Sequence, residues 1–197
     1  MNHIEQLYLQ IIHNTCTQTA SNITISQDVS ISLINLAQTQ SSLPFLLPYI
    51  KDSSLLANIK YQTKLMMLNY YQIEQFTRRI ADLFDANNIS YILLKGISLA
   101  AFYPVPEYRQ LGDVDIYIND KEIFNRANAL LLANGYTKDD EISDHHQGYL
   151  YKVPKTGRTM ILEIKRILMP LNLSLLPCYK QHQNRSCQQN LPYDLQE

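Results

Sequence analysis

The spacing of the apolar residues changes near residue 88, and this change restricts the folds that the chain can adopt. Between about Ser53 and Asn87 the apolar positions recur mostly every three or four residues, which places them on one face of a long helix. From residue 91 onward the apolar residues form short runs separated by Gly, Pro and Asn, as in strands joined by turns. The sequence therefore predicts a helical first part followed by a small sheet.

Shorter segments complete this outline. The apolar run at 91–94 predicts a buried strand, whereas 114–118 alternates apolar and polar residues and predicts a strand covered on one face. Pro154 to Gly157 is a turn signal that predicts a hairpin. Helices are expected at 3–13, from Ser26 or Asp28 to Ala37, at 97–103 and at 121–134, and strands at 91–94, 114–118, 147–153 and 159–167.

This order predicts an α+β fold with a small mixed sheet. We expect a helical N-terminal region, 1–88, packed on a core formed by 89–169. The last segment, 170–197, holds three prolines and many Gln and Asn, and it is expected to be irregular or poorly ordered.

Composition excludes some classes of function. The chain of 197 residues carries 17 basic and 18 acidic residues, so no global field would attract a polyanion. Three cysteines form no paired framework and favour a reducing compartment. We find no signal peptide and no apolar stretch long enough to span a membrane, so a soluble cytoplasmic protein is expected.

Three acids are candidates for a metal site. Asp113 and Asp115 are two residues apart, so on a strand their carboxylates project to the same face, where they repel each other unless a cation is present. Glu163 lies in the middle of a later apolar strand, where a charge is costly unless paired or metal-bound. If the strands are neighbours, the acids could hold two Mg²⁺ ions, activate a hydroxyl and stabilise a pyrophosphate leaving group.

A phosphate-binding segment is predicted between the first strand and the next helix. Lys95 and Gly96 end the strand, and a glycine lets backbone N–H groups at a helix start approach an anion. Ser98 and Lys95 add side-chain donors, and Arg109, four residues before Asp113, can reach the same anion. Each feature alone also fits an ordinary turn or surface residue, and only the combination favours a site.

Other polar clusters carry weaker signals. His145 and His146 are adjacent and face opposite ways on a strand, which favours a structural or solvated role. The basic hairpin turn with Arg158 fits a solvated turn better than a phosphate contact. Cys178, His182 and Cys187 match no zinc spacing.

The central block resembles a known family. The residues that carry this resemblance are Ile92-Leu93-Leu94-Lys95-Gly96, Leu99-Ala100, Tyr103-Pro104, Arg109, Gly112-Asp113-Val114-Asp115-Ile116, Asp144-His145-His146 and Ile161-Leu162-Glu163-Ile164. On these residues the chain is similar, over roughly residues 28–168, to the uncharacterised nucleotidyltransferase family NTP_transf_5, within the polymerase-β-like superfamily.

The resemblance implies a reaction. Asp113, Asp115 and Glu163 would be the metal-binding and catalytic acids, with Mg²⁺ or Mn²⁺, and Gly96 and Ser98 would contact the NTP. The superfamily transfers a nucleoside monophosphate to a hydroxyl of a protein, an RNA or a small molecule, so the resemblance names no acceptor.

Three departures keep an alternative open. Ser98 stands one place later than in the usual glycine–serine pair, and Lys165-Arg166 replaces a common His-Trp pair. The family usually continues with further helical sequence, whereas a polar tail is expected here. The alternative is a catalytically weak nucleotide-binding or partner-binding module. In either case, a partner protein or a second copy of the chain could complete the site.

Overall fold

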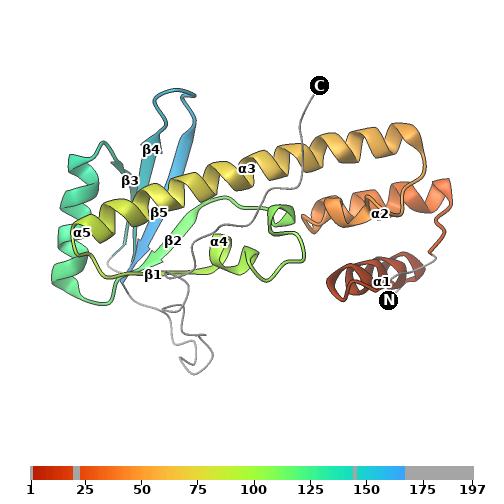
Figure 1. The fold of residues 1–197 in the computed structure, drawn as a ribbon, viewed down its shortest axis with the longest axis horizontal. Coiled ribbons are helices and arrows are strands. Elements are labelled where there is room, and N and C mark those ends of the chain that lie inside the picture. Colours follow the sequence, from red (N-terminus) through yellow and green to blue (C-terminus); the bar gives the residue numbers. More distant parts are fainter. Residues whose placement is uncertain (1, 20–22, 144–145, 167–197) are drawn as a thin grey trace. The chain divides into compact units, whose positions relative to one another are not determined.

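The computed structural model describes residues 2–19, 23–143 and 146–166, all within one compact unit, Met1–Ile167. The first three α-helices precede every strand, and two further helices lie between strands of one mixed sheet, so the predicted α+β class is confirmed (Figure 1). The elements in chain order are α1 His3–Cys16, α2 Gln27–Thr39, η1 Leu43–Leu46, α3 Ser53–Ala86, β1 Ile92–Leu93, α4 Lys95–Ala100, η2 Pro106–Tyr108, β2 Val114–Tyr117, α5 Lys121–Ala133, β3 Thr137–Ser143, β4 His146–Lys152 and β5 Thr159–Lys165.

A capping side chain and a left-handed residue mark the two ends of the long helix α3. The Asp52 side chain accepts hydrogen bonds from the backbone N–H groups of Ser54 and Leu55, both at 3.0 Å, which satisfies donors that have no partner within the helix. The helix ends before Asn87, and Asn88 adopts a left-handed conformation with φ of 52°. Among the described residues, no helix has the length and apolarity that a membrane span requires.

One face of α3 contributes to two hydrophobic clusters. Near its start, Ile59 packs in a cluster with residues of α1, α2 and η1, including the fully buried Ile11 and Leu33. Further along, Ile73, Phe76, Ile80 and Phe84 pack in a second cluster with residues of the sheet and α5. The helix therefore contributes to two separate apolar clusters, one with the N-terminal helices and one with the sheet.

The sheet has the strand order β1-β2-β5-β4-β3. β2 and β5 run parallel, and every other neighbouring pair runs antiparallel. In the β2–β5 pair, Val114 lies opposite Leu162 and Asp115 lies opposite Glu163. Two strands brought side by side from distant parts of the chain thus place two acids next to each other.

The two faces of the sheet differ because side chains alternate along each strand. Val114 and Ile116 of β2, together with Leu162 and Ile164 of β5, are buried in the cluster that includes α3 and α5. Asp115 and Glu163 alternate with these residues and therefore project from the opposite face. The apolar face stabilises the fold and leaves the other face free for polar groups.

Two sequence-based expectations need correction, and one strand was missed. The segment 91–94 does not form a buried strand: β1 lies at the sheet edge with Ile92 45% exposed, since an apolar run does not reveal how many neighbours a strand has. Asp115 is not on an uncovered face, because it is only 2% exposed. The charged strand β3 was not predicted, because its sequence lacks apolar alternation.

Some predictions lie outside the described residues. These are the predictions for the tail at 170–197, for Cys178, His182 and Cys187 within it, and for His145.

Adjacent residues of β5 provide a test of this two-faced arrangement. Leu162 is fully buried and Ile161 is 40% exposed. Leu162→Ala is expected to lower the free energy of unfolding by about 2–5 kcal/mol, because it leaves a cavity in the core. The matched variant Ile161→Ala should lose less than half as much. Urea denaturation followed by circular dichroism measures both, and equal losses would contradict the assignment of faces.

Candidate active site

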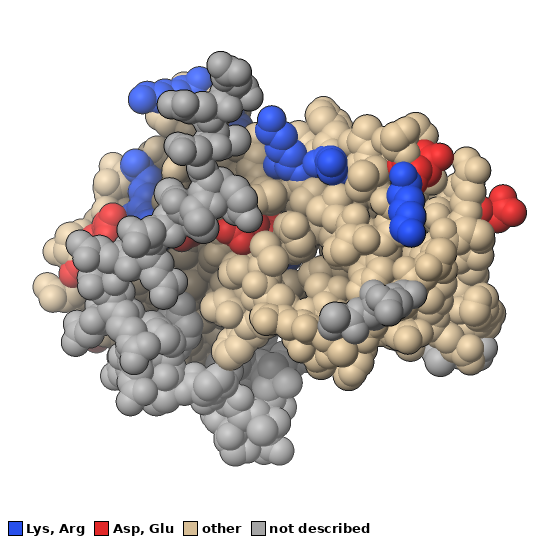
Figure 2. All heavy atoms as spheres, turned by 45° about the vertical axis from the view of Figure 1, so that its right-hand side comes forward, with Lys and Arg blue, Asp and Glu red and all other residues tan. Residues whose placement is uncertain are grey.

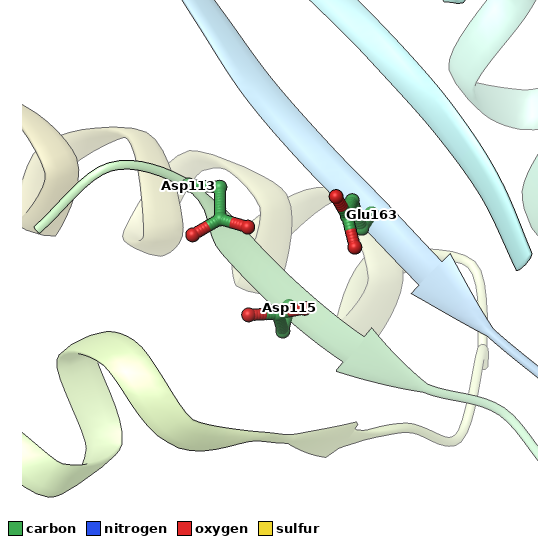
Figure 3. Close-up of side chains that lie close together, drawn as sticks. All are labelled: Asp113, Asp115 and Glu163. Atoms are coloured by element: carbon green, nitrogen blue, oxygen red, sulfur yellow. The ribbon is translucent and has the colours of Figure 1, made fainter. Parts of the chain in front are cut away.

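Three carboxylates meet on the sheet face opposite the apolar core. Asp113 immediately precedes β2, Asp115 lies within β2, and Glu163 lies on the parallel neighbour β5 (Figure 3). One oxygen from each residue can be chosen so that all three atoms lie within 4.8 Å of one another. The structure therefore brings together the three acids that the sequence singled out.

Two lysines cover Asp115. Lys95 Nζ lies 2.9 Å from Asp115 Oδ2, and Lys165 Nζ lies 2.7 Å from Oδ1 and 3.2 Å from Glu163 Oε2. Both Asp115 oxygens are buried, so the two ammonium groups compensate a charge that is shielded from water. Divalent cations can also provide such positive charge.

The charges shift the ionisation of neighbouring groups. Burial, followed by the nearby Asp115 and Glu163 carboxylates, raises the pKa of Asp113, and Lys95 only partly offsets this. Burial alone would lower the pKa of Lys165, but Asp115 and Glu163 outweigh it and raise that pKa. The cluster therefore stabilises Lys165 as an ammonium ion. It disfavours the ionised form of Asp113 unless a further cation lies nearby.

The segment from Lys95 to Ser98 lies against the start of β2. Gly96 has φ of 47° and ψ of −115°, a conformation that residues with a Cβ rarely adopt, and a Cβ there would lie 3.5 Å from the Asp113 carbonyl oxygen. The Ser98 hydroxyl donates to the Lys95 carbonyl at 2.7 Å. Only a single helical turn follows Gly96, so a helix dipole contributes less here than the sequence suggested.

Arg109 holds this segment in place. Its Nε donates to the Gly96 carbonyl at 2.9 Å, and its Nη1 donates to the Tyr103 hydroxyl at 3.1 Å. The guanidinium also lies 5.5 Å from the centre of the Tyr103 ring. The structure thus places Arg109 beside Gly96, and its contact with a phosphate stays a prediction.

A second set of contacts orients the chain that enters β2. The Asn69 side chain donates to the Leu111 carbonyl at 2.6 Å, two residues before Asp113. Arg158, next to the hairpin turn, donates to the side chains of Asn69 and Gln72 on α3. Arg158 therefore has a structural partner, and sequence reasoning missed Asn69 because its partners lie far away along the chain.

Sequence reasoning also assigned no role to Lys165, which stood only as a departure from the family pattern. The signal was present, because Lys165 follows Glu163 by two residues and must share its face of β5. What the sequence could not show is that β2 lies alongside, with Asp115 within reach of the same ammonium group.

The surface charge is dispersed on the face that Figure 2 shows. There the described Lys and Arg side chains lie in separate small groups and form no single broad patch. This agrees with the near balance of 17 basic and 18 acidic residues. Charge on this face supports local anion recognition better than general attraction of a polyanion.

Paired acids on adjacent strands, beside a glycine-bearing segment, fit a metal-binding nucleotidyltransferase. A model of the family described as uncharacterised nucleotidyltransferase matches residues 32–188. The match spans most of the chain, so the protein belongs to this family. A comparison with curated protein sequences finds no significant match.

Asp113→Asn is expected to stabilise the metal-free chain at neutral pH. A carboxyl whose pKa rises on folding costs stability once ionised, and the cost grows as the pH rises from the unfolded pKa to the folded pKa. The neutral amide removes this cost, which is under about 1 kcal/mol for a partly exposed group. Thermal unfolding at pH 7 with a chelator present should show a higher Tm for the variant.

The matched control is Asp82→Asn, on an exposed position of α3, which should leave Tm unchanged. Millimolar Mn²⁺ should raise Tm for the original chain and for the control, but much less for Asp113→Asn. A metal-free Asp113→Asn chain that melts at a lower temperature would contradict this account of the cluster.

Proposed function

We propose that the protein is a metal-dependent nucleotidyltransferase that transfers a nucleoside monophosphate from an NTP to a hydroxyl acceptor. The observation that carries this proposal is the convergence of Asp113, Asp115 and Glu163 from two parallel strands to within 4.8 Å. The family match supports the same reaction class. The acceptor is a protein, an RNA or a small molecule.

The donor set fits a hard divalent cation. Carboxylate oxygens are the protein ligands that Mg²⁺ and Mn²⁺ favour. The negative charge of the carboxylates around Asp113 would attract such an ion. Asp113 and Asp115 would hold it, with Glu163 completing the acidic surface. When bound, the ion would supply positive charge to the phosphate oxygens of the NTP.

The residues around the acids would handle the rest of the substrate. Lys95 is 54% exposed and has one contact with Asp115, so it can turn toward a phosphate when a metal ion takes over that contact. Gly96 and Ser98 would approach the triphosphate, and Arg109 would add charge while it fixes the Gly96 peptide. Glu163 would accept a proton from the acceptor hydroxyl.

A second candidate is a catalytically weak nucleotide-binding or partner-binding module. It is favoured by the lysines that already neutralise Asp115, because a site balanced by its own cations has less need of a metal. Net NTP consumption separates the two candidates. Binding of an NTP without turnover, under any divalent ion, would support the module.

Amide substitutions test the enzyme proposal. Asp113→Asn and Asp115→Asn are each expected to lower nucleotidyl transfer by at least about 10²-fold, because they remove charge that the metal ion needs. Arg109→Ala should raise KM for the NTP by roughly tenfold, whereas the concentration of Mg²⁺ or Mn²⁺ that the variant requires should stay unchanged. The measurement is release of labelled pyrophosphate from γ-labelled NTPs, with each of the four bases.

The control for these variants is again Asp82→Asn, which should keep full activity. Circular dichroism should show that each variant is folded. If the doubly substituted Asp113→Asn, Asp115→Asn chain retained its pyrophosphate release, the acids would not be the catalytic centre.

A further inference from the structure

Lys165 is held between two of the three acids by the sheet itself. Its Nζ lies 2.7 Å from Asp115 Oδ1 and 3.2 Å from Glu163 Oε2, and its side chain is only 26% exposed. Its backbone pairs with Tyr117 of β2, so its Cα cannot leave the site without a change in the sheet. The ammonium group is therefore a built-in cation of this cluster.

Lys95 differs from Lys165 in its place in the fold and in the number of carboxylates that it contacts. It stands at the start of the Gly96 segment rather than on a strand of the sheet, and its side chain is 54% exposed. Its single contact within the cluster is with Asp115 Oδ2, at 2.9 Å. It can release that oxygen at little cost, whereas Lys165 would have to leave two carboxylates at once.

Space and charge both limit what else the cluster can bind. A divalent ion would need the same Asp115 and Glu163 oxygens at about 2.1 Å, where it would collide with the Lys165 ammonium group and be repelled by it. With Lys95 turned away, Lys165 and one divalent ion together balance the three ionised carboxylates. The geometry leaves the Asp113 side of Asp115 for that ion.

We propose that Lys165 takes the position of a second divalent ion, so that the site binds a single Mg²⁺ or Mn²⁺ on Asp113 and Oδ2 of Asp115. This inference rests on the proposed function and deepens it, because it sets the number of metal ions. It also assigns Glu163 to holding Lys165 rather than a metal. Lys165 acts as a positioning residue, through the charge that it places beside Asp115.

The test counts Mn²⁺ ions on the full chain. Each protein is saturated with α,β-methylene-ATP, whose bridging carbon prevents cleavage at the α-phosphorus, and titrated with Mn²⁺. Electron paramagnetic resonance gives the number of bound ions, after subtraction of Mn²⁺ on free nucleotide, and separates isolated ions from coupled pairs. The original chain should bind one ion with an uncoupled spectrum, and Lys165→Met should bind two with a coupled spectrum.

Three variants serve as matched controls. Lys60→Met removes an exposed lysine of α3 and should bind one ion. Lys95→Met should also bind one, several-fold more tightly, because it removes a competitor from Asp115 without opening the Glu163 side. Lys165→Arg keeps the positive charge and should bind one Mn²⁺ ion. If Lys165→Met fails to fold, the ion count of Lys165→Arg still tests the role of this charge.

The outcomes separate this inference from the proposed function. Two ions on the original chain, or one ion on a folded Lys165→Met chain, would overturn the role of Lys165 and leave the nucleotidyltransferase proposal standing. If neither the original chain nor any variant bound Mn²⁺ with the nucleotide analogue, the role of Lys165 and the nucleotidyltransferase proposal would both be wrong. One ion on the original chain and two on Lys165→Met would support both.

Discussion

The parallel pairing of β2 with β5 is the constraint on which the site depends. In this register Asp115 lies directly beside Glu163, and Lys165 can reach both carboxylates. A shift of one residue would turn Glu163 toward the apolar core and bring Leu162 or Ile164 to the charged face. The intervening α5, β3 and β4 provide the long connection that a parallel pair needs, and β4 covers the other edge of β5.

This pairing also explains how a small sheet tolerates the buried charge of Asp115. The apolar face packs against α3 and α5, and the fold gains its stability there. On the other face, two ammonium groups lie beside three carboxylates, which leaves one negative charge when all three acids are ionised. Burial, together with the neighbouring carboxylates, raises the pKa of Asp113. This negative charge costs some stability, and in the function that we propose it attracts a divalent cation.

Contacts from outside the sheet then fix the position of Asp113, which lies just before β2. On one side Arg109 holds the Gly96 carbonyl, and on the other Asn69 holds the Leu111 carbonyl with Arg158 behind it. These contacts come from α3, the η2 segment and the hairpin, so elements far apart in the sequence orient one carboxylate. Such support fixes the backbone on both sides of Asp113, as the metal and phosphate site that we propose would require.

The sequence by itself determined the types of the main elements, because the apolar period differs between the long helix and the later strands. It also placed Asp113 with Asp115 on one face, since residues two apart on a strand share a side. Tertiary structure alone decided that β1 is an edge strand, that charged β3 pairs at all, and that Asp115 is covered by Lys95 and Lys165. The physical reason is that local periodicity records which face of an element is apolar. Strand neighbours, register and ion pairs depend on residues that are separated along the chain, such as Asp115 and Lys165, and these meet only when the sheet forms.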